Sequence, residues 1–278
     1  MKNTYDKLAY SISKCTTHMY STSFSLGIKA LDVKLRPAIY AIYGFVRLAD
    51  EIVDSFHGYD QSNLLNQLIQ QTEAALVNKI SINPIIQSFQ ETVHQYNIDK
   101  QLIDQFLHSM SMDLDKVYYD KENYDEYILG SAEVVGLMCL HVFVEADQNQ
   151  YEKLKPYAQK LGSAFQKINF LRDLKEDYYT LGRFYFPNLD FIAFNDETKK
   201  VIEKEIEGEF KEALIGIKML PNSSKFGVYL AYRYYWTLFK KIQLKSSKDI
   251  LTKRTRVPNT EKMYLMMESY LNLKLDRI

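Results

Sequence analysis

Acidic side chains recur at helical spacing in the segment 39–54, next to apolar ones. Tyr43, Arg47, Asp50 and Asp54 follow one another by three or four residues and so share one face of a helix, with Glu51 beside them. An apolar stripe with the same spacing runs alongside this face: Ile39, Ile42, Val46, Ala49 and Val53. Acids, a guanidinium and a phenol thus border the side of the helix that is expected to face the core.

A second helical face carries carboxylates in the segment 166–177. Gln166, Asn169, Asp173 and Asp177 recur at intervals of three or four residues, and Arg172 flanks them. Carboxylates four residues apart repel each other and weaken a helix by about 0.2–0.5 kcal/mol. Because the pattern occurs on two helices, it predicts a positive group that compensates for the repulsion.

Magnesium is the ion that these acids predict. A single pair of acids at this spacing is more often an exposed, solvated face, but here both pairs have an arginine and apolar neighbours. Mg²⁺ takes oxygen ligands and is typically shared between one or two carboxylates and a substrate phosphate, with Mn²⁺ as the alternative ion. Arg47, Arg172 and Arg183 would clamp a diphosphate and stabilise its charge as it leaves.

Aromatic residues near both faces could stabilise the carbocation that remains when a diphosphate leaves. Departure of a diphosphate from an allylic carbon leaves a carbocation, which lasts only where water is excluded and which aromatic faces stabilise. Each aromatic residue alone is more often plain core, so a role is predicted only for the set as a whole. The predicted wall residues are Phe24, Tyr43, Phe45, Tyr127, Phe165, Phe170 and Tyr185.

The elements that position these residues are expected to be helices. Of 278 residues, 46% are hydrophobic, only 10 are Gly and 6 are Pro, and no run alternates like a strand, which predicts an all-α single domain over residues 1–278. We expect nine or ten helices and a structured loop over 182–195. The expected helix starts lie at Pro37, Asn83-Pro84, Asp99, Asn123 with Glu126, Asn222 and Asn259.

The charge balance excludes some partners. Lys plus Arg and Asp plus Glu number 35 each, so no overall field would attract nucleic acid. No secretory signal or stretch approaching 20 apolar residues is evident, which predicts a cytoplasmic protein. Cys15 and Cys139 stand alone and are expected to be reduced thiols.

Together these segments resemble the squalene/phytoene synthase family, and bacterial phytoene synthases most of all. Residues 21–54 resemble its N-terminal block, 169–187 its second aspartate-rich motif, 124–138 its small-residue helix with Tyr127, and 229–242 and 253–262 its C-terminal part. The resemblance covers nearly the whole chain. It implies an isoprenoid synthase fold, a helical bundle around a central cavity with both aspartate motifs at its mouth.

The resemblance also implies roles for individual residues. Asp50, Asp54, Asn169, Asp173 and Asp177 would bind Mg²⁺, with Glu51 in place of the second Asp of the family's usual motif. The residues expected to hold or surround the substrates are Ser23, Phe24, Tyr43, Arg47, Tyr127, Gln166, Asn169, Arg172, Arg183, Tyr185, Tyr235 and Arg254. The four aspartates of the two motifs, with Tyr43 and Arg47, would be the catalytic set. Thr22 departs from the family, many members of which carry Lys or Arg there.

The implied reaction is a head-to-head condensation in two steps. One prenyl diphosphate ionises and is captured by the other, giving a cyclopropyl diphosphate, which ionises, rearranges and loses a proton or accepts a hydride. The chain ends without the hydrophobic anchor usual in members that reduce with NADPH, so no NADPH is expected. We therefore expect phytoene from two geranylgeranyl diphosphates via prephytoene diphosphate. The alternative is dehydrosqualene or squalene from two farnesyl diphosphates.

Two other classes of protein compete with this interpretation. A non-catalytic helical scaffold of the same fold should have lost the acids, and both sets are intact. A di-iron bundle needs two Glu-x-x-His motifs on different helices, and only Glu91 with His94 fits. Because the expected product is a hydrophobic hydrocarbon, peripheral contact with the inner membrane face or with a downstream desaturase is a further hypothesis. The sequence leaves the oligomeric state open.

Overall fold

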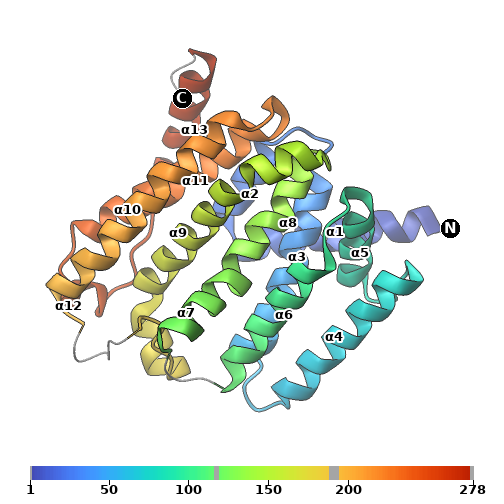
Figure 1. Ribbon diagram of the computed structural model, residues 1–278, viewed down its shortest axis with the longest axis horizontal. Coiled ribbons are helices and arrows are strands. Elements are labelled where there is room, and N and C mark those ends of the chain that lie inside the picture. Colours follow the sequence, from blue (N-terminus) through green and yellow to red (C-terminus); the bar gives the residue numbers. More distant parts are fainter. Residues whose placement is uncertain (1, 116–118, 188–193, 276–278) are drawn as a thin grey trace.

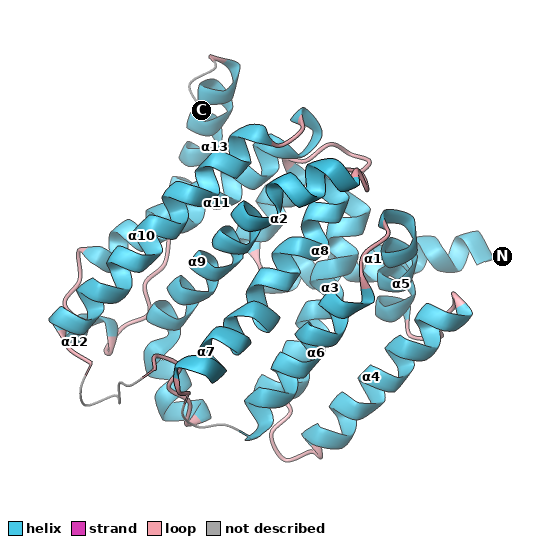
Figure 2. Ribbon diagram, viewed as in Figure 1, coloured by secondary structure: helices cyan, strands magenta, loops and turns pink. Residues whose placement is uncertain are grey.

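The regular elements of the residues that the structure describes are helices, as predicted (Figure 1, Figure 2). The computed structural model describes residues 2–115, 119–187 and 194–275. Its elements are α1 (Lys2–Tyr20), α2 (Thr22–Lys29), α3 (Arg36–Asp54), α4 (Gln61–Asn78), α5 (Pro84–Tyr96), α6 (Lys100–Asp115), α7 (Lys121–Ile128), the π-helical turn η1 (Leu129–Glu133), α8 (Val134–Phe143), α9 (Gln148–Leu181), α10 (Asp196–Met219), α11 (Asn222–Gln243), α12 (Ser247–Ile250) and α13 (Asn259–Lys274).

The expected number of helices was too low. The described residues contain thirteen α-helical segments. The π-helical turn η1 separates α7 from α8 within one continuous helical stretch, and α12 is a single turn. Of the expected loop over 182–195, residues 182–187 and 194–195 lie outside helices, whereas 188–193 lie outside the described residues.

The expected helix starts are partly confirmed. The Asn83 side chain accepts hydrogen bonds from the first turn of α5, and Pro37 lies in the first turn of α3. Asn123 is not an N-cap, because Asp120 accepts from the Asn123 backbone N–H at 2.8 Å and starts α7 three residues earlier. Asn222 and Asn259 are likewise the first residues inside α11 and α13, each preceded by a proline.

Two long helices, α3 and α9, carry the predicted acid faces through the middle of the bundle (Figure 1). On α3 the apolar stripe lies inward as expected, with Ile39, Ile42, Ala49 and Val53 buried and Val46 half-buried. Helix α3 packs against α1, α5, α6 and α8, and α9 packs against α8, α10, α11 and η1. The two acid faces are therefore held on rigid, well-packed helices.

Small residues allow α6, η1 and α9 to pack closely. A Cβ at Gly162 of α9 would lie 2.6 Å from the Ala132 carbonyl oxygen in η1. A Cβ at Gly130 of η1 would lie 2.6 Å from the Gln105 carbonyl oxygen in α6. Since these neighbours are backbone atoms, the approach requires glycine at both positions. The stretch with Tyr127 is thus drawn close to both α6 and α9.

The expectation that no stretch approaches a membrane span needs correction. Among the described residues, Lys121–Phe143 is long and apolar enough by composition alone. Half of its most apolar window is buried inside the molecule, which is also the pattern of a core helix in a globular protein. Length and composition here are weak evidence for a membrane span.

Candidate active site

A cavity of about 570 Å³ joins the two acid faces. Its polar lining residues include Tyr43, Arg47, Asp50, Asp54, Gln166, Asn169, Arg172, Asp173, Asp177 and Arg254. Its apolar lining residues include Phe24, Ile28, Leu31, Ile42, Val135, Leu140, Phe143, Leu154, Leu161, Phe165, Ile217, Leu220 and Val228. A group of charged residues thus shares one chamber with a large aliphatic and aromatic surface.

The acid pair of α3 places two carboxylates close together at the cavity. Burial and the nearby Asp54 carboxylate raise the pKa of Asp50 to about 7, although Arg47 opposes the shift from 3.9 Å away. Asp54 is the last residue of α3, and the carboxyl end of a helix favours cations over anions. The arrangement therefore favours a cation beside these two carboxylates.

The acid pair of α9 also contains one carboxyl group whose pKa is raised. Asp173 is held by two arginines, with the Arg172 Nε donating at 2.9 Å and the Arg254 Nε lying 2.7 Å from Oδ1. Burial, followed by the neighbouring Asp173 and Asp54 carboxylates, raises the pKa of Asp177 to about 8. The protonated form is thus favoured at Asp177 unless a cation binds.

The two acid faces meet across the cavity. The Asp54 carboxylate of α3 is close enough to raise the pKa of Asp177 on α9. Arg183, which follows the end of α9, donates to Asp54 Oδ1 at 2.7 Å and to the Val53 carbonyl oxygen at 3.1 Å. The carboxyl-terminal ends of α3 and α9 are therefore neighbours.

Three of the predicted site residues lie beside the cavity without lining it. Glu51 forms an ion pair with Arg47, whose guanidinium also lies 4.3 Å from the centre of the Tyr20 ring. Ser23 lies on α2 next to Phe24, which does line the cavity, as does Ser21. Arg183 reaches the cavity through Asp54. The roles predicted for Glu51, Ser23 and Arg183 remain predictions, as do those of the residues that line the cavity.

The predicted aromatic wall is present with one exception. Phe24 lies 5.6 Å from Tyr43 between ring centres, and Phe165 stacks on Tyr235 at 3.9 Å. Tyr127, Phe170 and Tyr185 also line the cavity. Phe45 does not belong to the wall, because it faces the other side of α3 and stacks on Phe89 of α5 at 3.9 Å. Phe45 is core.

Sequence reasoning missed Asp113 of α6, which also lines the cavity. Burial raises the pKa of Asp113 to about 6, although Arg183 and the Tyr127 hydroxyl stabilise the charged form. Asp113 lies three and seven residues after the buried Met110 and Phe106, so the helical period of α6 already placed it on an inward face. That spacing was the available signal.

A cation from another helix lies beside Thr22. The Lys262 Nζ of α13 is 3.4 Å from the Thr22 Oγ1, and the side chain is almost fully buried. Burial lowers the pKa of Lys262. The position at which the resemblance leads us to expect Lys or Arg is thus approached here by a lysine that is distant in sequence.

The donor set fits a metal that is shared with a ligand. Within the described ranges, no three His, Cys, Asp or Glu side chains converge closely enough to bind a metal on their own. Mg²⁺ rarely uses such cages and takes one or two carboxylates together with phosphate oxygens and waters. Burial and neighbouring carboxylates raise the pKa values of Asp50 and Asp177, and a bound cation would favour their charged forms. These oxygen donors fit Mg²⁺ or Mn²⁺.

The Asp50 carboxyl predicts a pH dependence of stability without metal. Its pKa is raised from 3.8 to about 7 in the folded state, so the folded protein binds this proton more tightly than the unfolded chain. The resulting stabilisation is complete below about pH 4 and is lost as the pH rises through 7. At pH 9 without metal, Asp50→Asn should therefore be more stable than the native protein, by about 1 kcal/mol after solvent screening.

Thermal unfolding in metal-free buffer at pH 4 and pH 9 measures this difference. The difference in unfolding temperature between Asp50→Asn and the native protein should narrow towards pH 4, where residue 50 is uncharged in both proteins. An equal gap at both pH values would contradict the raised pKa.

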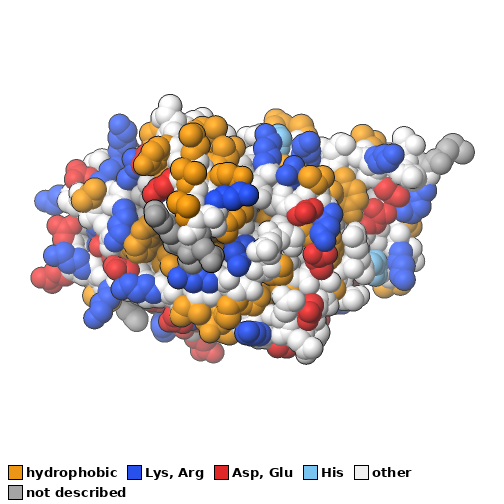
Figure 3. Space-filling model, turned by 90° about the horizontal axis from the view of Figure 1, so that it is seen from above, with side chains coloured by type: hydrophobic (Ala, Val, Ile, Leu, Met, Phe, Trp, Pro, Cys, Tyr) orange, Lys and Arg blue, Asp and Glu red, His pale blue; other side chains and the backbone are white. Residues whose placement is uncertain are grey.

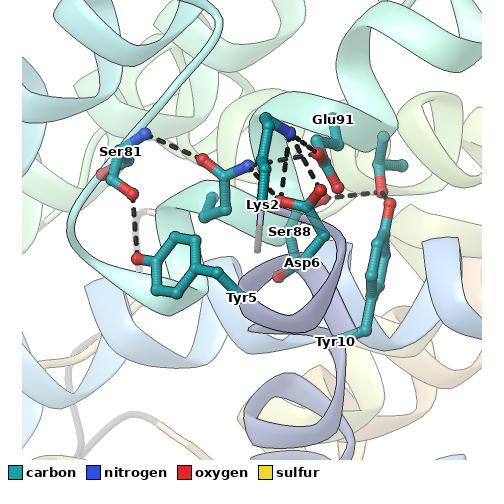
Figure 4. A network of polar contacts seen from close by, with 9 residues as sticks. Lys2, Tyr5, Asp6, Tyr10, Ser81, Ser88 and Glu91 are labelled. Carbon is teal, nitrogen blue, oxygen red and sulfur yellow. Dashed lines mark hydrogen bonds and ion pairs between the residues drawn. The ribbon is translucent and has the colours of Figure 1, made fainter. Parts of the chain in front are cut away.

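The Glu91 and His94 pair lies on α5, away from the cavity. Glu91 pairs with Lys2 at 2.8 Å and accepts from the Gln87 amide, in a polar network that joins α1 to α5 (Figure 4). The exposed His94 side chain hydrogen-bonds to the Leu76 carbonyl oxygen at 3.0 Å. Both side chains therefore tie surface elements together, which does not favour the di-iron interpretation.

Known proteins resemble the chain over most of its length. A family model described as squalene/phytoene synthase matches residues 17–261. The chloroplastic phytoene synthase of Narcissus pseudonarcissus is 28% identical, over 97% of this chain and 66% of that protein. The phytoene synthase of Arthrospira platensis is 26% identical, over 96% and 94%. The chain thus spans about two thirds of the chloroplastic relative.

Solved structures share the fold. A dehydrosqualene synthase, determined in complex with a ligand, has a TM-score of 0.82 at 22% identity, covering 97% of this chain and 98% of that one. A squalene synthase from Alicyclobacillus acidocaldarius has a TM-score of 0.75 at 20% identity, covering 86% and 94%. At these identities the likeness concerns the fold alone, and it confirms the predicted isoprenoid synthase fold.

Proposed function

Because the chain belongs to the squalene/phytoene synthase family, whose members are prenyltransferases, we propose that it condenses two prenyl diphosphates head to head. The observation that carries this proposal is that two acid-bearing helices meet at one apolar cavity. Asp54 of α3 and Asp177 of α9 both line it, and the Asp54 carboxylate raises the pKa of Asp177. A chamber of this kind suits a substrate with a charged end and a long hydrocarbon tail.

Each set of residues has a defined task in this proposal. Asp50, Asp54, Asp173 and Asp177, with Asn169, would hold Mg²⁺, which supplies charge neutralisation for the leaving diphosphate. Arg47, Arg172 and Arg254 would bind the diphosphate oxygens in place of the carboxylates that all three contact here. The apolar lining excludes water, and the rings of Phe24, Tyr43, Phe165 and Tyr235 face the developing cation.

For the substrate we propose geranylgeranyl diphosphate, giving phytoene through prephytoene diphosphate in carotenoid biosynthesis. Support comes from the phytoene synthases of Narcissus pseudonarcissus and Arthrospira platensis, which match nearly all of this chain. The alternative is farnesyl diphosphate, giving dehydrosqualene or squalene. The fold is shared with a dehydrosqualene synthase and a squalene synthase. Because the fold alone does not select the substrate, the choice depends on the side chains that close the apolar end of the cavity.

Product analysis tests the substrate assignment. Purified protein with Mg²⁺ and geranylgeranyl diphosphate should form phytoene without NADPH, and farnesyl diphosphate should give a lower kcat/KM. One missing prenyl unit removes apolar contacts, and discrimination of about 10–200-fold is the range seen for even a single methylene group. Product from farnesyl diphosphate alone would replace the phytoene assignment with the dehydrosqualene one. No hydrocarbon from either substrate would favour a non-catalytic scaffold.

The proposed product is also the basis for a proposal about the location and partners of the protein. Phytoene is a hydrocarbon, so we propose a cytoplasmic enzyme that contacts the inner membrane face or a downstream desaturase. Hydrophobic side chains gather over the end of the molecule at which α13 lies (Figure 3). In α13 the side chains of Met263, Tyr264, Met267 and Leu271 are exposed, as is that of Leu275 directly after it. Such a surface supports the hypothesis of a hydrophobic contact with the membrane or a desaturase.

A further inference from the structure

Asp113 of α6 approaches the cavity from a third helix, outside both acid pairs. Its side chain is 3% exposed and accepts hydrogen bonds from three phenols, those of Tyr119 at 3.2 Å, Tyr127 at 2.6 Å and Tyr185 at 3.2 Å. The Arg183 guanidinium lies 3.7 Å from the same carboxylate. A carboxylate has about four acceptor positions, and the three hydroxyl groups occupy three of them.

The three phenols belong to one group of packed rings. Ring centres are 5.1 Å apart for Tyr127 and Tyr185, 5.2 Å for Tyr119 and Tyr185, and 4.2 Å for Phe170 and Tyr185. Tyr127, Phe170 and Tyr185 line the cavity. Because three hydroxyls end on one buried carboxylate, none of these tyrosine rings can change rotamer without losing a hydrogen bond in a low-dielectric interior.

Arg183 links this group of rings to the first acid pair. Its Nη1 donates to Asp54 Oδ1 at 2.7 Å and lies 3.4 Å from the Tyr185 hydroxyl, and its Nη2 donates to the Val53 carbonyl oxygen. A continuous polar chain therefore runs from Asp54 through Arg183 to Asp113. One end of this chain is at the proposed diphosphate site and the other holds part of the aromatic wall.

We infer that Asp113 is a positioning residue for the proposed condensation: it fixes the rings of Tyr127 and Tyr185 against the cavity and holds Arg183 at Asp54. The inference rests on the proposed function. If Asp113 acts in this way, the aromatic wall and the diphosphate-binding end of the cavity keep the same position relative to each other during both ionisations.

A carboxylate is required here because every partner is a donor. In Asp113→Asn, the new amide nitrogen cannot accept, so either Tyr127 or the pair Tyr119 and Tyr185 loses its acceptor. The rings would then move while the diphosphate contacts of the other residues remain. A cation that is held less well is open to water, which adds to it and loses a proton to give a prenyl alcohol.

The test compares native protein, Asp113→Asn and Asp104→Asn with Mg²⁺ and the prenyl diphosphate that the native protein uses. Asp104 is an exposed acid on the same helix, paired with Lys100, and its variant should match the native protein. Asp113→Asn should lose about 100-fold in kcat with little change in KM and should divert product to prenyl alcohol. Native kcat and native products in Asp113→Asn would overturn the inference.

A double mutant separates positioning from general damage. Tyr127→Phe combined with Asp113→Asn should be no worse than Asp113→Asn alone, because the hydroxyl acts through the carboxylate. Fully multiplicative losses would overturn the inference. If Asp113→Asn does not fold, Tyr185→Phe takes its place and should show the same diversion to alcohol; native products there would count against the inference. Failure of the native protein to form any hydrocarbon would instead refute the proposed function.

Discussion

Asp50→Asn and Asp173→Asn are each expected to lower turnover by about 10³-fold while leaving the protein folded. The two residues lie on different helices and line the same cavity. Each substitution keeps the shape of the side chain but removes a charge on which metal binding depends. Loss of either carboxylate should therefore leave the leaving diphosphate without part of its charge stabilisation.

Steady-state kinetics with saturating Mg²⁺ measures this loss. Glu152→Gln is the matched control, since Glu152 is an exposed acid on the same helix as Asp173 and should tolerate the change. Circular dichroism should show native helix content in all three variants. Activity near that of the native protein in either aspartate variant would refute the site assignment.

Removal of divalent metal is expected to abolish turnover completely. Without a cation, burial and mutual repulsion favour protonation of Asp50 and Asp177, as their raised pKa values near 7 and 8 indicate. Metal binding requires the deprotonated forms, so the Mg²⁺ concentration needed for half-maximal activity should rise as the pH falls below 7. Lowering the pH should thus weaken metal binding before it unfolds the protein.

Turnover after chelation and dialysis, followed by titration with Mg²⁺ or Mn²⁺, tests this prediction. Both ions should restore activity, because both accept carboxylate and phosphate oxygens. A dialysed protein that still turns over substrate at a substantial rate would contradict it. A metal requirement that does not change with pH would contradict the role given to the two raised pKa values.

The acid faces could be predicted because they are local. The spacing of Asp50 and Asp54 follows directly from the helical period, and it also predicted which side of α3 is buried. Phe45 shows the limit of this reasoning. It lies one residue before Val46, about 100° around the helix, and that step turns it from the cavity towards Phe89 of α5.

The helical period of α6 places Asp113 on an inward face, but its role could not be predicted from the sequence because that role depends on tertiary contacts. Its partners Tyr127 and Arg183 lie on other segments, and only the close packing of α6, η1 and α9 brings them together. An isolated Asp in an amphipathic helix is more often exposed. The same holds for Lys262, which reaches Thr22 from the far end of the chain. Long-range pairs of this kind leave no periodic signal.

The central claim is that both helices hold the same metal-bound leaving group, and a double-mutant cycle on ligand binding tests it most directly. Calorimetric titration of inorganic diphosphate with Mg²⁺ would compare the native protein, Asp50→Asn, Asp173→Asn and the combined variant. If one cluster spans both helices, each single change should weaken Mg²⁺-dependent binding, and the combined change should add little more. Additive losses of binding free energy in the combined variant would contradict the account, as would diphosphate binding that neither substitution weakens.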